Sequence, residues 1–521
     1  MGGISIVGTV AAQDGSVVTF NRLGELDPKF HPLFAQSNQF MIDYLVYDNL
    51  VRLDLTDPTL QGLVPDLAES WEASDDATTY TFHLQPGVTW QDGTPFTAND
   101  VVFTATWGAQ NIDSYIGFAP VWGGLDGAAE AAGTTAAVAG VSAPDDHTVV
   151  FTLAEPDAYF LRNLAEAQNV ILPAHLWSGV AAADVETNPL TSSPVGTGPF
   201  SITAMEPDQY IELTANKDYF GGTPGVDKVI YKFETPTSAL TDIQAGGLDL
   251  LLDAPASELA TLEGIQGTTL FKVPSPGIYA LTVQDDNPRF ADARVRQAMY
   301  YGIDRRGIVD AVLGGNAKVL IGPPGFAEYD DLDPYAYDPD KARQLLADAG
   351  FDASQPVRLI WSQDGADNAA VVPVIVQQLQ DLGMTVESTP MDDASYDDIT
   401  SDPARRGEFD LSISIGGSEG LSPARTARYI LCDEDLGTSI GYRNCDMTAL
   451  FAEAATTVDA AKQDEIYHQI ATMLNTDVPQ LYLWSPLGLH VASDALGGSF
   501  STVPSFTRYT TMNADGWQVS R

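Results

Sequence analysis

Basic residues are scarce in this chain. Its 521 residues include 25 Lys and Arg against 71 Asp and Glu, which gives a formal net charge of −46. A surface of this sign repels the phosphates of nucleic acids and anionic lipid headgroups, so the composition argues against nucleic-acid binding and against docking on membranes through a basic patch. Two explanations of the acidic excess stay open: a hydrated or salt-adapted surface, and an acidic cleft for a cationic ligand.

Long apolar runs are also lacking. The sequence contains no run of 18 apolar residues, so no transmembrane helix is expected. No secretory leader is visible, because Met1-Gly2-Gly3 is followed by neither a basic segment nor a long apolar core. The chain therefore fits either a cytoplasmic protein or a mature extracytoplasmic protein whose leader has been removed.

Metal-ligating residues are few and scattered. The chain has two Cys and six His, with no close His pair and no Cys at ligand spacing. No phosphate-binding loop or dinucleotide fingerprint follows a suitable strand. We therefore expect no metal site and no cofactor.

The chain is nevertheless clearly globular. Its hydrophobic fraction of 44% and its length of 521 residues predict two or three domains with substantial cores. The densest pattern lies between Leu63 and Thr104. There we expect a helix over 65–71, a turn at Asp76, a strand over 79–84 returning through 88–90, and a helix after the capping-box pair Thr97 and Asp100.

The same stretch resembles the signature of the family 5 extracellular solute-binding proteins, the peptide- and nickel-type receptors of ABC importers. The residues that match the family pattern keep its spacing: Pro65, Leu67, Ala68, Ser70, Trp71, Asp76, Tyr80, Phe82, Leu84, Gly87, Val88, Asp92, Gly93, Pro95, Phe96, Ala98, Asp100 and Val101. Further similar segments lie at 26–28, 145–153, 194–200, 216–222, 243–250, 290–298, 303–305 and 335–351. The resemblance thus spans nearly the whole chain.

The resemblance implies an α/β fold, a two-lobed clamp of the periplasmic-binding-protein type (type II, cluster C) with an accessory subdomain in the first lobe. The chain should cross between the lobes near 275–285 and 475–490. The expected parts are 1–45 (lobe I, first part), 46–185 (accessory subdomain), 186–280 (lobe I, second part), 281–480 (lobe II) and 481–521 (return to lobe I).

Local signals predict several further elements. A Gly/Ala-rich stretch over 123–143 reads as a solvated loop, and the glycines beside Thr197 should supply tight turns before a strand at 200–203. Asp338 should cap a helix that Gly350 ends. Strands at 357–361, 386 and 409–415, with a helix over 371–382, predict βαβ units and a parallel-rich sheet.

The resemblance also locates candidate ligand contacts. Peptide receptors of this family pair the ligand's ammonium with an Asp in a G-W-x-x-D-like loop, which corresponds here to 415–423. Gly417 replaces the Trp, the Asp is missing, and Glu419 is the only carboxylate of the loop. The candidate ligand-binding residues are Asn38, Gln39, Phe40, Tyr279, Trp361, Gly417, Ser418, Glu419, Arg425, Tyr482 and Trp484. Core packing is the alternative role of each aromatic residue.

One motif points toward an enzyme. Residues 416–420 form G-x-S-x-G, in which Ser418 would be a hydrolase nucleophile with His468 or His490 downstream. The upstream sequence lacks a hydrolase pattern, so we expect no catalytic residues.

The function implied is an extracytoplasmic receptor that captures an oligopeptide or similar small solute in an interlobe cleft and delivers it to the membrane permease of an ABC transporter. An oligosaccharide ligand is the alternative, and a serine hydrolase a remote one. A periplasmic or cell-surface lipoprotein that acts as a monomer is expected. In that compartment Cys432 and Cys445 would form one disulfide; two unrelated thiols are the alternative.

Overall fold

The computed structural model describes most of the chain. The expected strand at 4–7 and the Leu-Asp-Pro segment at 26–28 lie outside the described residues. The described residues are 16–23, 29–34, 39–57, 62–112, 119–274, 277–284, 287–322, 325–363, 365, 367–416, 423, 426, 432, 442–498 and 509–520.

The chain forms two compact units. Unit 1 comprises Met1–Ala254, Ala260–Val273 and Gly488–Arg521, and unit 2 comprises Pro255–Leu259 and Pro274–Leu487. The chain thus passes into unit 2 near Pro274 and back after Leu487. The finer limits expected within the first lobe, including an accessory subdomain over 46–185, stay predictions.

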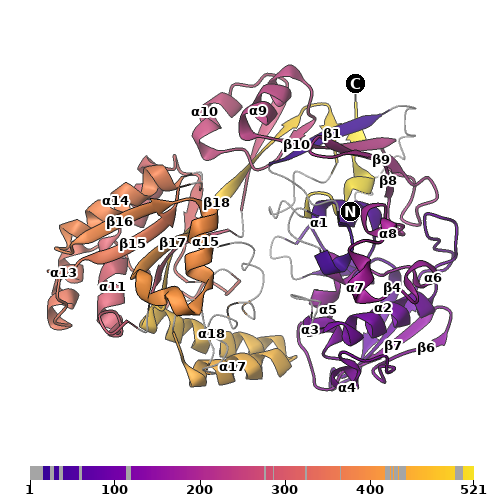
Figure 1. Cartoon of the computed structure of the whole chain (residues 1–521), viewed down its shortest axis with the longest axis horizontal. Helices are drawn as coiled ribbons and strands as arrows, with labels where there is room; N and C mark the ends of the chain where they lie inside the picture. Colours follow the sequence, from indigo (N-terminus) through magenta and orange to yellow (C-terminus); the bar gives the residue numbers. More distant parts are fainter. Residues whose placement is uncertain are drawn as a thin grey trace, which may run out of the picture. The chain divides into compact units, whose positions relative to one another are not determined.

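Unit 1 contains a run of mixed sheet, drawn in indigo to magenta in Figure 1. The strand order is β11-β1-β10-β9-β8, with β1 parallel to β10 and the pairs β10–β9 and β9–β8 antiparallel. The bounds are β1 Val17–Leu23, β8 Phe200–Glu206, β9 Tyr210–Ala215, β10 Lys228–Glu234 and β11 Leu250–Leu251. A helix, α9 (Pro236–Ala245), precedes β11, and Gly246 ends it at φ 76°.

A separate four-stranded sheet in unit 1 contains residues 68–73 and 79–84 of the 63–104 stretch. Its order is β4-β5-β7-β6, with bounds β4 Ala68–Ala73, β5 Thr79–Leu84, β6 Val141–Asp145 and β7 Thr148–Thr152. The strand expected at 79–84 is confirmed. The partners of β5 are β4 and β7, so the expected return through 88–90 is wrong; Thr89 makes only an isolated bridge to Pro95.

The helix expected over 65–71 is also wrong. Residues 63–65 form β3 and residues 68–73 form β4, in which Trp71 pairs with Phe82 of β5. An isolated helix of two turns is only marginally stable. Pairing with β5 gives the backbone N–H and C=O groups of residues 68–73 hydrogen-bond partners, so this segment forms a strand despite the helical spacing of its apolar residues. The turn at Asp76 is confirmed, since its Oδ1 accepts hydrogen bonds from Ser74 Oγ at 2.6 Å and Thr78 Oγ1 at 2.8 Å.

The capping box at Thr97 is confirmed. It opens α2 (Ala98–Gln110), where the Asp100 carboxylate accepts the Thr97 N–H at 2.9 Å. The Gly/Ala-rich stretch is more ordered than expected. It contains α4 (Ala128–Ala131) and the start of β6, and Ala128, Ala131 and Val138 are buried.

The other elements that lie wholly or partly in unit 1 are mostly short. The helices are α1 Phe40–Val46, α3 Ala119–Trp122, α5 Phe160–Leu164, α6 Ala174–Trp177, α7 Ala182–Val185, α8 Pro189–Ser192 and α10 Leu259–Leu262. The 3-10 turns are η1 Pro32–Phe34, η3 Ala167–Asn169, η4 Ala256–Glu258 and η8 Ala514–Gly516. The remaining strands are β2 Val51–Leu53, β3 Leu63–Pro65, β12 Thr268–Pro274, β19 Leu496–Gly497 and β20 Gln518–Val519.

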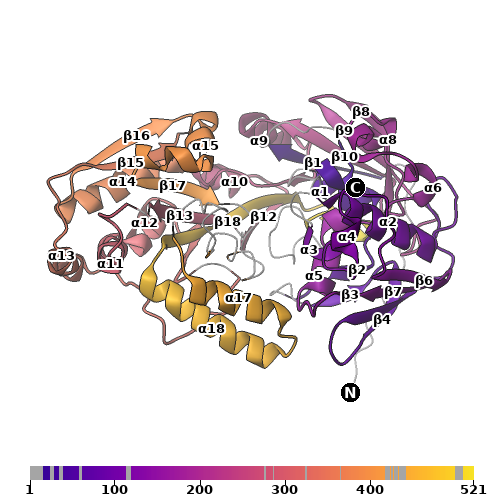
Figure 2. The same cartoon turned by 60° about the horizontal axis from the view of Figure 1, so that its bottom comes forward.

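Unit 2 is built on a sheet with strand order β16-β15-β17-β13-β18, and β14 also pairs with β18. The strands β16, β15 and β17 are mutually parallel and lie side by side in Figure 2. This confirms the predicted βαβ alternation. The bounds are β13 Ile278–Val283, β14 Ala317–Val319, β15 Val357–Ser362, β16 Val386–Met391, β17 Leu411–Gly416 and β18 Gln480–Ser493.

Helices pack around this sheet and bury a large apolar cluster that includes Leu281, Leu359 and Ile413. The cap predicted at Asp338 is confirmed, because its Oδ1 accepts the Lys341 N–H at 2.9 Å at the start of α13. The helices are α11 Ala293–Gly302, α12 Arg305–Ala311, α13 Pro339–Asp348, α14 Asn368–Asp381, α15 Asp393–Ser401, η5 Pro403–Glu408, α17 Cys445–Thr456 and α18 Ala460–Asp477.

The predicted disulfide is present. Cys432 and Cys445 are bonded with their Cα atoms 4.5 Å apart, and the bond ties residue 432 to the start of α17.

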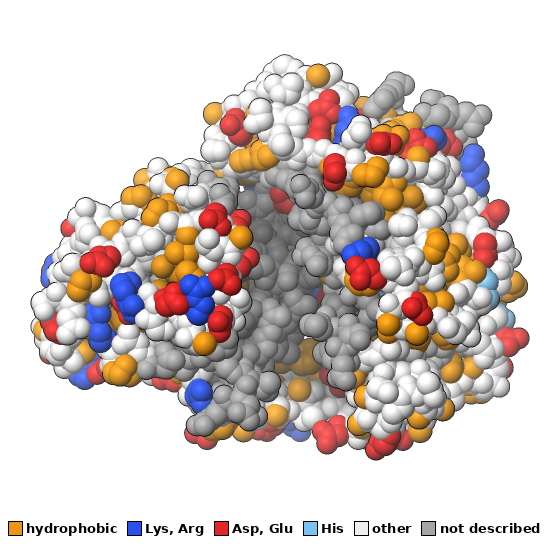
Figure 3. Space-filling model, in the orientation of Figure 1, with side chains coloured by type: hydrophobic (Ala, Val, Ile, Leu, Met, Phe, Trp, Pro, Cys, Tyr) orange, Lys and Arg blue, Asp and Glu red, His pale blue; other side chains and the backbone are white. Residues whose placement is uncertain are grey.

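Acidic side chains are scattered over the face of the molecule that Figure 3 shows rather than gathered in one patch. Among the described residues, no helix is both long and apolar enough to cross a membrane.

Candidate functional site

The carboxyl ends of β15, β16 and β17 meet at one edge of the unit 2 sheet. Ser362 lies opposite Met391, and Trp361 lies opposite Ile413. In open α/β sheets ligands bind outside this edge, where loops and helix starts converge. We call this part of unit 2 the carboxyl edge.

Two predicted aromatic residues stack at the carboxyl edge. Tyr279 of β13 and Trp484 of β18 have ring centroids 4.5 Å apart and an interplanar angle of 15°. Each is only 1% exposed. The faces of the two rings therefore contact each other and the core. This is the core-packing role that the sequence analysis gives as the alternative to ligand binding.

A β-bulge brings these two rings together. The register between β13 and β18 shifts after Tyr279, so Tyr279 pairs with Trp484 while Ala280 pairs with Tyr482. Leu483 is the extra residue, and it joins the same apolar cluster as Trp484. Bulges re-aim side chains in this way. Tyr482 instead packs with Ile278 and Ala280 in a separate cluster, so it does not share a surface with Trp484.

A buried polar chain supports the stack. Tyr279 O–H donates to Asn368 Oδ1 at 2.6 Å, and Asn368 Nδ2 donates to the Ser362 carbonyl at 2.7 Å. Burial, and then Asp367 and Tyr396, raise the pKa of Tyr279, so its hydroxyl stays a donor. The chain joins β13, the end of β15 and the first residue of α14.

Three further groups lie at this edge. Trp361 is 8% exposed, and its Nε1–H donates to Ser388 Oγ at 3.0 Å. Ser362 O–H donates to the carboxylate of Asp393 at the start of α15. Burial raises the pKa of the half-buried Asp367, which is the N-cap residue of α14.

Of the other predicted contacts, only Gln39 and Phe40 lie among the described residues, and they belong to unit 1. Gln39 and Phe40 are both 4% exposed at the start of α1 in unit 1. Asn38, Gly417, Ser418, Glu419 and Arg425 lie outside the described residues, as does most of the G-x-S-x-G segment. Their roles stay predictions.

Sequence reasoning missed Asn368, Ser362 and Asp367. A usable signal was present, since a polar residue that ends a buried strand and polar residues that open the next helix meet at the same sheet edge.

The described histidines form no site with these groups. His468 Nε2 lies 2.9 Å from Asp331 Oδ1, and burial lowers the pKa of His490. Within the ranges the structure describes, no cluster of three His, Cys, Asp or Glu could hold a metal ion.

We predict that Tyr279→Phe lowers the free energy of unfolding by about 1–2 kcal/mol, because the buried Asn368 Oδ1 loses its donor. Urea unfolding followed by tryptophan fluorescence measures this. The matched control is Tyr337→Phe, whose ring is 48% exposed and whose midpoint should not move. An equal response of the two variants would contradict a stabilising role for the hydrogen bond.

Comparison with known proteins identifies the family. The sequence profile of the bacterial extracellular solute-binding proteins, family 5, matches residues 62–435. The chain belongs to this family. A candidate ABC transporter peptide-binding protein of Brucella ovis is 30% identical over 490 residues, which cover 91% of this chain and 88% of that protein. Heme-binding protein A of Haemophilus influenzae is 26% identical over 488 residues, which cover 90% of this chain and 87% of that protein.

A solved structure of an ABC transporter substrate-binding protein has the same fold. The ABC transporter substrate-binding protein CtaP of Listeria monocytogenes matches with a TM-score of 0.85 and 25% identity, over 98% of this chain and all of that one. The chain of this family 5 protein therefore has the α/β fold of periplasmic binding proteins. Its relatives are binding proteins of ABC transporters rather than enzymes.

Proposed function

We propose that this family 5 protein captures an oligopeptide or a closely related small solute outside the cytoplasm and delivers it to the membrane permease of an ABC importer. The observation that carries the proposal is the end-to-end match to the Brucella protein, at 30% identity over 91% of this chain. The receptor acts as a monomer and performs no catalysis.

The burial of the aromatic residues at the carboxyl edge of unit 2 favours the proposal of a peptide over a sugar. An oligosaccharide receptor needs open aromatic faces, whereas Tyr279 and Trp484 are 1% exposed and stacked on each other. The half-buried carboxyl group of Asp367 at this edge suits a ligand with amide or ammonium groups. Gly417, Ser418, Glu419 and Arg425 stay predicted ligand contacts from the sequence.

Ligand binding is tested by thermal unfolding of protein stripped of any bound solute by unfolding and refolding. A ligand at about 100 times its dissociation constant should add roughly 2.7 kcal/mol to the stability. We expect this rise with a mixed oligopeptide pool. Native mass spectrometry of the unstripped protein should show an added mass that a peptide explains.

Parallel arms separate the alternatives. An oligosaccharide pool and haem are tested beside the peptides, because a relative at 26% identity is named for haem. Stabilisation by sugar or haem without peptide binding would overturn the ligand class while keeping a receptor. If no pool stabilises the protein and no mass is added, the receptor proposal is wrong.

A further inference from the structure

The buried carboxyl groups of the N-terminal half include a pair, Asp48 and Asp66, that the candidate ligand site does not use. Asp48 lies between α1 and β2 and is 5% exposed, and Asp66 lies between β3 and β4 and is 2% exposed. Both belong to unit 1. Asp66 stands inside the family signature stretch, yet it caps no helix and forms no tight turn of its own.

The two groups have different hydrogen-bond partners. Asp48 Oδ2 accepts the Thr197 hydroxyl at 2.7 Å, and its Oδ1 accepts the Tyr219 hydroxyl at 3.0 Å. Asp66 Oδ2 accepts the Asn49 backbone N–H at 3.0 Å. Asp66 Oδ1 is buried without a hydrogen bond, and Arg52 Nε lies 3.4 Å from it. Of the four carboxyl oxygens, Asp66 Oδ1 is the one without a hydrogen bond, and the Arg52 guanidinium is the charge that lies against it.

The charges around the pair do not balance. Among the described residues, the titratable and charged groups that act on the pair most strongly are Arg52 of β2, Tyr219 after β9 and Asp515 of η8. One guanidinium thus faces two buried carboxyl groups and a third, partly exposed one. Two carboxylates in a desolvated site cannot both ionise cheaply beside a single cation, so one of them retains a proton.

The electrostatics agree with this arrangement. Burial raises the pKa of Asp48 to about 6, although the hydroxyls of Thr197 and Tyr219 and the charge of Arg52 lower it. Burial, and then the neighbouring Asp48, raise the pKa of Asp66 well above its ordinary value.

We propose that Asp48 and Asp66 form a proton-binding lock, which holds the segments at 48–52, 66, 197 and 219 together in the protonated state and weakens when the proton is released to solvent. The lock is independent of the ligand and of the proposed function. It would make unit 1 more stable in acid than in alkali.

The direction of the pH effect follows from linkage. An unfolded Asp loses its proton near its ordinary pKa of 3.8, whereas the folded pair keeps a proton to higher pH. Between those values the folded state binds more protons than the unfolded state, so stability falls as pH rises. The stabilisation is complete below the ordinary pKa of Asp and is lost above the pKa of the folded pair.

The test compares unfolding midpoints at about pH 5 and about pH 8, in salt concentrated enough to screen surface repulsion. The variants are Asp66→Asn and Glu130→Gln, the latter removing one exposed carboxylate of α4 as a charge-matched control. The control should keep the full drop in midpoint of the wild type. In Asp66→Asn the drop should shrink, and its midpoint at the higher pH should approach its midpoint at the lower pH.

A second variant and a second readout keep the proposal falsifiable. Asp48→Asn can still bond both hydroxyls, and it should flatten the pH profile in the same way even if Asp66→Asn does not fold. An infrared difference spectrum of wild type minus variant at about pH 6 should show the stretch of a protonated carboxyl group. The proposal would be overturned if the unfolding midpoint of both variants falls between the two pH values as much as that of the control. The absence of the protonated-carboxyl band would overturn it as well.

Discussion

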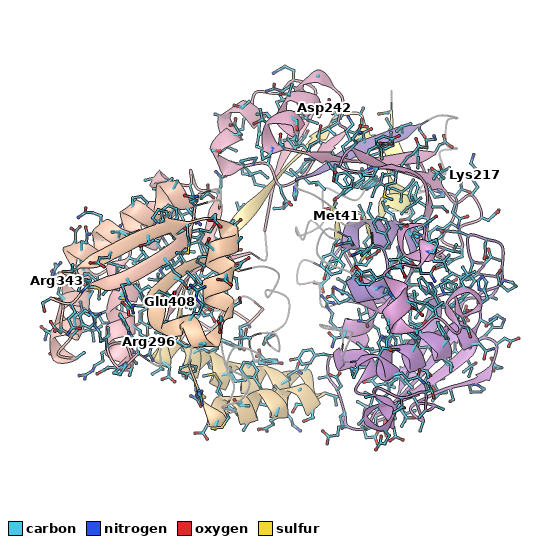
Figure 4. All side chains as sticks on the ribbon, viewed as in Figure 1. Met41, Lys217, Asp242, Arg296, Arg343 and Glu408 are labelled. Carbon is cyan, nitrogen blue, oxygen red and sulfur yellow. A yellow bond between two sulfur atoms is a disulfide. The ribbon has the colours of Figure 1, made fainter. Side chains whose placement is uncertain are left out.

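Replacing Arg296 by Met should lower the free energy of unfolding of unit 2 by about 3–5 kcal/mol. Arg296, labelled in Figure 4, is 4% exposed on α11. Its guanidinium donates to the carbonyls of Asp477 and Val478 at the end of α18 and to that of Phe290 before α11. These carbonyls have no further intrahelical partner, and each buried one left without a donor costs roughly 1–3 kcal/mol.

Arg294 on the same helix supplies the matched control. It is paired with Asp292 at 2.6 Å on the surface, where its side chain is 47% exposed. Arg294→Met removes the same charge from the same helix, yet its unfolding midpoint in urea should barely move because solvent replaces the partner. If the two variants lose similar stability, the cost comes from charge or helix propensity and the capping role of Arg296 is wrong.

Local chemistry made much of the secondary structure predictable. Asp338, Pro339 and Gly350 bound α13 through a side-chain cap, a fixed φ and a left-handed residue at φ 66°. The alternation in 79–84 likewise predicted β5, whose burial alternates residue by residue. Such signals need no knowledge of the rest of the chain.

Predictions failed where a distant segment decides the structure. Residues 65–71 have helical spacing of apolar residues, but β5 pairs with 68–73 and converts them into a strand. The carboxyl edge shows the same limit. The bulge that turns Trp484 onto Tyr279 depends on the register of two strands some 200 residues apart, and Asn368 becomes part of the site only through its contact with Tyr279.

The glycines beside Thr197 were predicted as residues of tight turns, and the structure gives them another role. Neither Gly196 nor Gly198 is among the glycines with positive φ. Both instead press against the end of α1, where the Gly198 N–H donates to the Val46 carbonyl at 2.8 Å. A Cβ on Gly198 would lie 2.6 Å from the Val46 carbonyl carbon. The sequence shows that positions 196 and 198 carry no side chain, but it does not show which distant backbone segment packs against them.

Gly196→Ala should therefore be among the most damaging small substitutions in unit 1. The added Cβ would lie 1.8 Å from the Val46 carbonyl oxygen and 2.6 Å from its carbon, which are backbone atoms that cannot rotate away. Overpacking of a core costs about 1–3 kcal/mol when side chains can adjust, so we expect a loss of at least about 3 kcal/mol here.

The clash lies where the proposed proton lock is assembled. Gly196 precedes Thr197, whose hydroxyl binds Asp48, so pushing this segment away from α1 should also weaken that hydrogen bond. Gly516→Ala is the control, because no atom lies within 4 Å of its added Cβ and its φ is not in the left-handed region. Urea midpoints at two pH values measure both effects: Gly196→Ala should be destabilised throughout and lose part of the acid stabilisation, while Gly516→Ala follows the wild type. An intact pH profile in a folded but destabilised Gly196→Ala would separate the close packing of α1 from the lock, and an unchanged midpoint would show that the backbone at Val46 yields to the methyl group.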